Sequence, residues 1–361
     1  MFRPPRKLIF HIGDRKTGST TIQNALATGR ILVDGRKPLY PASMAHNYLL
    51  KHFNAYDRES KILKNNPGRP NLEKISQLLE HEEYAYAVIS GEKFEEAKPN
   101  VAKSVMEKFL LPHVNQHSVI CYIRPHAART LSSFAEQTKI GSHSGDVLGF
   151  HRRAIKKNRF KYEQRLRLWT DEFEDKFIAR PFVRDVLTNG SPIDDFNGCA
   201  FPDAKVEIEQ SEVANESLCL EDLVFLRYIQ GHLKTRSRPL RLGLGWNLAL
   251  DLTANHRKNQ STKLRLDRHT AEVIRKHYLT DARELDRTIF ASSPVMVREL
   301  DRAVDTALRK PQSMNPSDYY DSETLRYLAA VIDLVDKMLD NNNGRWASYF
   351  HEHRVDQLHR S

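Results

Sequence analysis

The stretch KLIFHIGDRKTGSTTIQ, residues 7–23, decides how this chain is expected to fold. An apolar run, Leu8–Ile12, leads into a short segment bounded by Gly13 and Gly18, and residues with hydroxyl groups follow. A strand, a glycine-bearing turn and a helix in this order direct free backbone amides and the positive end of a helix dipole toward an anion. The stretch therefore predicts a loop that binds a phosphate-like group.

The position of the lysine distinguishes this loop from an ATP-binding P-loop. In the G-x-x-x-x-G-K-[ST] pattern the lysine follows the second glycine. Here Ser19 holds that place, and the lysine comes earlier, at Lys16. From inside the loop its ammonium group can reach a bridging oxygen of the ligand as well as terminal oxygens. The hydroxyls of Ser19, Thr20 and Thr21 are expected to add donors at the first helical turn.

Composition places the chain among globular proteins with an anionic ligand. Of its 361 residues, 40% are hydrophobic and 28% are charged, and the formal net charge is +10. Such a balance suits nucleic acid, an anionic membrane surface, a nucleotide or an acidic polymer. Three cysteines without metal-ligand spacing indicate a reducing compartment. With no signal-peptide core and no apolar run of about 20 residues, we expect a cytoplasmic protein that is not integral to a membrane. Peripheral binding to a membrane is the alternative.

Short apolar runs alternate with helical patterns in the first part of the chain, which is typical of a parallel sheet with crossover helices. Strands are predicted at Leu8–Ile12, Tyr84–Ser90, Ser118–Ile123 and 177–183, and helices at 99–112, 162–177, 220–233 and 325–339. Two polar segments, 141–149 and 234–259, are predicted as loops, and the second could instead be a lid over an anionic substrate. We expect an α/β fold that is one domain over residues 1–361. Its core would span about 7–218, and a helical region would span about 219–361.

A second motif, SVICYIRPHAARTLSSF at residues 118–134, tests the first one independently. Arg124 follows a predicted strand, and ligands of open α/β sheets bind at the carboxyl ends of strands. Ser132 lies eight residues later, a little over two helical turns, so a returning helix could bring its hydroxyl beside the guanidinium. An arginine with a hydroxyl is a suitable receptor for a second phosphate.

Together the two motifs resemble those of the sulfotransferases that use 3′-phosphoadenosine 5′-phosphosulfate (PAPS). The order G-x-x-K-[ST]-G-[ST]-T matches Gly13–Thr20 position by position, and Arg124 with Ser132 fits the second signature of that family. The resemblance implies a three-layer α/β sandwich with a mostly parallel central sheet, similar to P-loop NTPases. It implies PAPS as donor, 3′,5′-adenosine bisphosphate (PAP) as product, and a small-molecule or glycan acceptor, with carbohydrate preferred. The residues implied in donor binding are Gly13, Arg15, Lys16, Thr17, Gly18, Ser19, Thr20 and Thr21 for the phosphosulfate, and Arg124 and Ser132 for the 3′-phosphate. Lys16 would also assist departure of the bridging oxygen.

The resemblance spans most of Lys7–Leu218 and is specific only at these two motifs. Softer likenesses to bacterial sulfotransferases lie at residues 179–196 and at Val213–Leu218.

Sulfuryl transfer needs a base that accepts a proton from the attacking hydroxyl or amine. Glu92, in ISGEKF at residues 89–94, follows a predicted strand on the same sheet edge as the loop. The alternative reading makes it a first-turn glutamate of a helix capped by Ser90. His46 is the next candidate base, whereas His11 is expected to be a packed, hydrogen-bonded residue. No metal is needed, because lysine, arginine and backbone donors can offset the charge on the leaving group.

Two other functions remain open at this point. A P-loop kinase or NTPase would use Mg-ATP and a carboxylate at the end of a neighbouring strand, a position that Glu92 could fill. A nucleic-acid-binding protein would suit the charge, but no zinc finger, RNA-recognition signature or basic helix with interleaved aromatics is present. We therefore expect no nucleic-acid partner.

Overall fold

The computed structural model describes residues 5–58, 69–209, 218–255, 262–292, 294–341 and 345–360. The chain forms two compact units that alternate along the sequence. The first unit comprises Met1–Pro125, Lys161–Ser211 and Thr280–Val297, and the second comprises His126–Phe160, Glu212–Leu279 and Arg298–Ser361. The expectation of a single domain stays a prediction.

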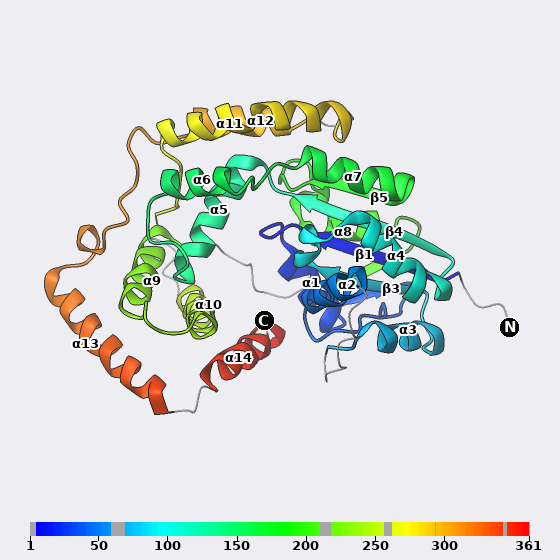
Figure 1. Cartoon of the computed structure of the whole chain (residues 1–361), viewed down its shortest axis with the longest axis horizontal. Helices are drawn as coiled ribbons and strands as arrows, with labels where there is room; N and C mark the ends of the chain where they lie inside the picture. The colour runs from blue at the N-terminus through cyan, green and yellow to red at the C-terminus, as the bar shows by residue number, and fades with distance from the viewer. Residues whose placement is uncertain are drawn as a thin grey trace. The chain divides into compact units, whose positions relative to one another are not determined.

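A four-stranded parallel sheet with the order β3-β1-β4-β5 forms the centre of the first unit (Figure 1). Its strands are β1 (Lys7–Gly13), β3 (Tyr86–Gly91), β4 (Gln116–Ile123) and β5 (Phe177–Pro181). The α/β prediction and all four predicted strands are confirmed, although β5 ends at Pro181, which has no amide to donate to a ladder. Ile12 lies opposite both Gly91 and Cys121, so β1, β3 and β4 end at the same edge of the sheet.

Helices pack on both faces of this sheet because its strands are apolar on both sides. On one face, Ile9 belongs to a core cluster with Ile22 of α1 (Ser19–Ala27) and Phe196 of α8 (Pro192–Ala200). On the other face, Phe10 stacks on Phe53 of α2 (Leu49–Asp57) with ring centroids 6.0 Å apart. Helix α4 (Pro99–Phe109) packs against both α2 and α7 (Glu163–Phe173). This arrangement is consistent with a three-layer α/β fold.

The first unit also contains elements that the sequence did not predict. Strands β2 (Ile31–Val33) and β6 (Val206–Ile208) pair antiparallel in a separate small sheet, and three residues are too few to show a periodic pattern. The other elements are α3 (Leu72–His81) and the short 3₁₀ helices η1 (His46–Tyr48), η2 (Glu92–Glu96), η3 (Leu111–His113), η4 (Glu174–Lys176) and η5 (Thr188–Gly190). Two of these, η1 and η2, lie next to the candidate site.

The second unit is built from helices (Figure 1). They are α5 (His126–Lys139), α6 (Val147–Lys156), α9 (Leu220–His232), α10 (Arg238–Ala254), α13 (Ser322–Met338) and α14 (Trp346–Arg360), with the 3₁₀ helices η6 (Pro316–Asp318) and η7 (Leu339–Asn341). Helices α11 (Arg268–Thr288) and α12 (Met296–Asp305) contain residues of both units. The helices predicted at 220–233 and 325–339 are confirmed as α9 and α13.

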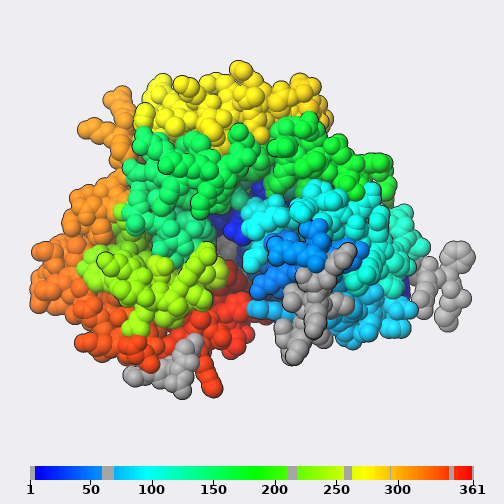
Figure 2. Space-filling view, in the orientation of Figure 1, coloured from blue at the N-terminus to red at the C-terminus, as the bar shows by residue number. Residues whose placement is uncertain are grey.

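Helix α13 has two apolar faces. Its inner face contributes Ile332 to a cluster with Ile229 and Leu233 of α9 and with Leu244 of α10. Its outer face lies at the surface of the molecule, where α13 is drawn in orange (Figure 2). The outer-face residues Tyr327, Val331, Leu334 and Met338 are each more than half exposed.

The loop prediction for residues 234–259 was wrong, because most of that segment is α10. Its many arginines and lysines had suggested a solvated loop, but its glycines allow close packing of a helix. A Cβ atom on Gly245 would lie 2.5 Å from the Lys139 carbonyl oxygen, and one on Gly243 would lie 2.8 Å from the Phe350 side chain. Pro239 sits in the first turn, where its missing amide costs no intrahelical bond. Residues 256–259 lie outside the described part of the chain.

The loop predicted at 141–149 ends earlier than expected. Helix α6 begins at Val147, and the Asp146 carboxylate caps it by accepting from the Gly149 amide at 2.7 Å.

Most of the stretch Val213–Leu218 lies outside the described residues. Among the residues that the structure does describe, no helix has the length and apolar character needed to cross a membrane.

Candidate functional site

The loop between β1 and α1 has the backbone of a tight, preformed turn. Lys16 and Gly18 both adopt left-handed conformations, with φ of 71° and 75°. Glycine adopts such a φ freely, whereas a lysine there carries strain that the surrounding structure has to hold. Inside the turn, the Thr17 hydroxyl donates to the Asp14 carbonyl at 2.5 Å. At the start of α1, the Thr21 amide donates to the Gly18 carbonyl at 3.0 Å.

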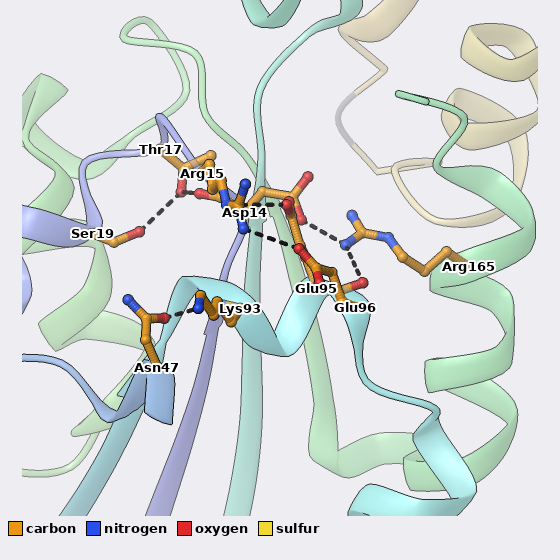
Figure 3. Close-up of polar contacts among 9 residues, drawn as sticks. All are labelled: Asp14, Arg15, Thr17, Ser19, Asn47, Lys93, Glu95, Glu96 and Arg165. Carbon is orange, nitrogen blue, oxygen red and sulfur yellow. Dashed lines mark hydrogen bonds and ion pairs between the residues drawn. The ribbon is translucent and has the colours of Figure 1, made fainter. Parts of the chain in front are cut away.

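Two of the hydroxyls expected to bind the donor are turned into the loop instead. Ser19 is 1% exposed, and its Oγ lies 3.3 Å from the Thr17 Oγ1 (Figure 3). A Cβ atom on Gly13 would come within 2.3 Å of this Ser19 Oγ. Glycine at position 13 is therefore required by the close approach of Ser19, and these hydroxyls fasten the loop. Thr20 and Thr21 remain half-buried at the first turn of α1.

The Gly13→Ala variant is expected to distort the loop. The added methyl overlaps the Ser19 hydroxyl, and overpacking of this kind costs about 1–3 kcal/mol. We expect urea-induced unfolding to show that loss, and Gly13→Ala/Ser19→Ala to recover most of it because the clashing oxygen is gone. An equal loss in the single and double variants would contradict this account of the loop.

A buried ion pair fixes the start of the loop. Asp14 is 1% exposed, and its Oδ1 lies 2.7 Å from Nη1 of Arg165 in α7 (Figure 3). Burial lowers the pKa of Arg165, but the Asp14 carboxylate, together with Cys121 and Glu95, outweighs that effect and raises the pKa above its usual range. The guanidinium also lies over the Tyr162 ring, 5.7 Å from its centroid. This pair could not be predicted from the sequence, because no local pattern joins an arginine in a helix to an aspartate so distant along the chain.

The neighbouring residue, Arg15, connects the loop to η2. Its guanidinium lies 3.6 Å from the Glu95 carboxylate and 3.0 Å from the Glu96 carboxylate (Figure 3). Arg165 donates to the Glu95 backbone carbonyl at 3.4 Å. Arg15 was expected to bind the phosphosulfate, and in this structure it pairs with two carboxylates. The loop and η2 are thus held together at the carboxyl edge of β1 and β3.

Arg124 follows β4 and lies against the loop. Its Nη1 donates to the Lys16 carbonyl at 3.0 Å, and its own carbonyl accepts from the Tyr162 hydroxyl at 3.0 Å. The guanidinium is 5.8 Å from the centroid of the Phe182 ring. Ser132, the predicted companion of Arg124, is half-buried in α5 and belongs to the second unit.

Glu92 is the first residue of η2 and follows β3 directly. It is half-buried at the edge where β1 also ends. The alternative reading is correct in placing Glu92 in the first turn of a helix, but it is wrong in making Ser90 the cap. Ser90 is part of β3, Gly91 precedes η2, and no side chain caps that short helix.

The candidate base His46 is fully buried, and burial lowers its pKa to about 3. Its Nδ1 lies 3.1 Å from the Ser90 amide nitrogen and 3.3 Å from the Ser90 carbonyl oxygen. Because an amide can only donate, Nδ1 is the acceptor, and the proton of the neutral ring is on Nε2. His46 then has no spare lone pair with which to take a substrate proton.

His11 matches its expected structural role. It is fully buried in β1, and its Nδ1 lies 2.8 Å from the Ser90 hydroxyl. Burial lowers the pKa of His11 to about 3. The Ser90 oxygen also accepts from the Gln23 amide at 3.1 Å, which leaves its proton for His11. Ser90 therefore joins β1, α1 and β3 beneath the loop.

Within the described ranges, no group of three or more His, Cys, Asp or Glu side chains is placed so that it could hold a metal ion. Comparisons of the chain with protein-family models, with curated proteins and with solved structures found no match.

Proposed function

We propose that this chain is a PAPS-dependent sulfotransferase that transfers a sulfuryl group to a hydroxyl or amine acceptor. The observation that carries the proposal is the hydrogen bond from Arg124 to the Lys16 carbonyl, 3.0 Å long. It joins the two sequence motifs at the carboxyl edge of a parallel sheet, where α/β proteins bind ligands. A donor with a 5′-phosphosulfate and a 3′-phosphate would use both motifs, whereas a nucleoside triphosphate carries no separate second phosphate for Arg124 to bind.

The residues present fit the 5′-phosphosulfate group. The left-handed turn at Lys16 and Gly18 leads into α1, whose first amides and dipole favour an anion. Asp14 would not repel that anion strongly, since Arg165 neutralises its carboxylate. Arg124 would bind a phosphate at the next strand end. When bound, PAPS supplies the activated sulfuryl group.

In the proposed reaction the acceptor oxygen forms a bond to sulfur while the bond from sulfur to the bridging oxygen of the phosphate breaks. Glu92 would take the proton of the acceptor, because it stands at the end of β3 beside the loop. The ammonium of Lys16 would stabilise the negative charge that develops on the bridging oxygen. A carbohydrate hydroxyl is our preferred acceptor, and this preference rests on the family resemblance.

The rival proposal is a kinase or NTPase that uses Mg-ATP, and Glu92 at the end of a neighbouring strand is the feature that favours it. The early position of Lys16 and the contact of Arg124 with the loop favour the sulfotransferase.

Thermal denaturation with PAP and, separately, with Mg-ATP distinguishes the two proposals. A ligand at 100 times its dissociation constant adds about 2.7 kcal/mol to the free energy of unfolding. We expect PAP to raise the melting temperature and Arg124→Ala to reduce that rise. Stabilisation by Mg-ATP alone would refute the sulfotransferase proposal. A rise caused equally by any polyanion, DNA included, would point to non-specific binding.

A further inference from the structure

Among the described residues no strand pairs with the outer edge of β3, and only Leu39 forms an isolated bridge there. In the sheet order β3-β1-β4-β5 this strand is at the edge, and the amides of alternate residues face outward. One of these amides, on Val88, donates to the Leu39 carbonyl at 2.9 Å, and the Leu39 amide donates to the Tyr86 carbonyl at 2.8 Å. The next outward amide belongs to Ser90. Beyond Leu39, side chains instead of a strand supply the acceptors.

Two side chains of η1 supply those acceptors. The Ser90 amide donates to Nδ1 of His46 at 3.1 Å, and the Lys93 amide donates to Oδ1 of Asn47 at 2.9 Å (Figure 3). Glu92 lies between the two amides that are held in this way. Neighbouring residues of η1 therefore fix the backbone before and after the candidate base.

The backbone between these two hydrogen bonds is also tightly packed. A Cβ atom on Gly91 would lie 2.8 Å from the Phe94 ring and 3.3 Å from the His46 carbonyl carbon. Phe94 is fully buried, and its ring centroid is 4.6 Å from that of Phe10 in β1. The turn that carries Glu92 thus has little room to move toward the core. On the η1 side the His46 backbone packs against the same turn, and the hydrogen bond from the Lys93 amide to Asn47 restrains it further.

We propose that Asn47 is a positioning residue for Glu92, holding the turn at the end of β3 in the orientation that directs the carboxylate at the acceptor. The inference rests on the proposed sulfuryl transfer. Asn47 touches neither donor nor acceptor in this role, and its effect is carried by the Lys93 amide. His46 holds the Ser90 amide, two residues before Glu92, in the same way, but its complete burial makes its variants poor tests.

The test compares Asn47→Ala, Asn47→Asp and a matched control, Asn71→Ala. Asn71 makes the same kind of bond, from the Lys74 amide to its Oδ1 at 2.9 Å, but at the start of α3. Release of PAP from PAPS is followed with the best acceptor from a panel of phenols, amines and N-acetylhexosamines. The Glu92 carboxyl is titrated by ¹³C NMR, with Glu92→Gln identifying its signal, and PAP binding is followed by thermal shift.

We expect Asn47→Ala to lower kcat by about 10- to 100-fold, since small errors in the placement of a catalytic group have effects of this size. The KM for PAPS and the shift caused by PAP should stay unchanged. Asn47→Asp keeps an acceptor oxygen, so kcat should largely recover. Its new charge should raise the pKa of Glu92 and move the acid limb of the pH–kcat profile upward. Asn71→Ala should lower the melting temperature without changing kcat or the Glu92 titration.

Wild-type kcat in Asn47→Ala, or an equal loss of kcat in Asn71→Ala, would overturn the positioning role. The role would also be overturned if Asn47→Asp had a kcat as low as that of Asn47→Ala and the titration of Glu92 were unshifted in it. Failure of the proposed function looks different, because the wild-type protein would then neither respond to PAP nor release it from PAPS.

Discussion

Replacement of Glu92 by glutamine is expected to slow sulfuryl transfer by about 10²–10⁴-fold, the usual contribution of a general base. Glutamine keeps the size of the side chain and the backbone of η2, so PAP should still stabilise the variant as it stabilises the wild type. The measurement is PAP release from PAPS under single-turnover conditions, together with the PAP-induced shift in melting temperature.

The Lys16→Ala variant distinguishes the role of Lys16, which stabilises the leaving oxygen, from the role of Glu92 as the base. Removal of one preorganised charge from the leaving oxygen costs about 10²–10³-fold in rate. Because the same ammonium also contacts the bound phosphosulfate in our proposal, the response to PAP should weaken, unlike that of Glu92→Gln. A glutamine variant with full activity would remove Glu92 as the base, and full activity in Lys16→Ala would remove the lysine from the reaction.

The second large effect concerns stability in mild acid. His11 and His46 are both fully buried, with pKa values lowered to about 3 by burial, against 6.5 for an ordinary histidine. Between pH 6.5 and about 3 the unfolded chain binds more protons than the fold, so the free energy of unfolding falls as the pH falls. At pH 5 each ring accounts for a loss of about 2 kcal/mol relative to neutral pH. The combined loss from the two rings is a large fraction of the free energy of unfolding of a typical domain.

Urea titrations at pH 7.5 and pH 5, followed by tryptophan fluorescence, measure this loss. His11→Gln is the informative variant, since glutamine can still bond the Ser90 hydroxyl and does not titrate. We expect the loss of stability between pH 7.5 and pH 5 to be smaller than in the wild type by the share of one ring, about 2 kcal/mol, whatever the stability of the variant at pH 7.5. An unchanged dependence would show that His11 is not held neutral in the fold.

The central sheet could be predicted from the sequence because the pattern that marks each of its strands lies within a few consecutive residues. A strand buried on both faces is a continuous apolar run, as in Leu8–Ile12, and glycine, proline or arginine marks its end. The position of Arg124 at a strand end could be predicted in the same way, because it directly follows such an apolar run. In the structure its guanidinium contacts the loop.

What the sequence could not predict depends on partners far away along the chain. Thr17 and Ser19 looked like ligand-binding hydroxyls, but the close approach to Gly13 turns Ser19 inward. His46 was a candidate base from the sequence, but in the structure its Nδ1 accepts a hydrogen bond from the Ser90 amide at the outer edge of β3. The basic segment 234–259 looked like a solvated loop, because the Lys139 carbonyl against which Gly245 of α10 packs comes from a distant helix.

The alternation of the two units along the chain has a consequence for synthesis on the ribosome. Helix α7, which carries Arg165, has its first amides held by Asp281, with bonds of 3.0 Å to Tyr162 and 3.2 Å to Glu163. Arg165 in turn neutralises Asp14 at the start of the loop. In a nascent chain that has not yet emerged as far as residue 281, Asp281 cannot cap α7. This is the helix whose Arg165 neutralises Asp14 at the start of the loop. The N-terminal loop is one of the first parts to be translated and one of the last to reach its final form.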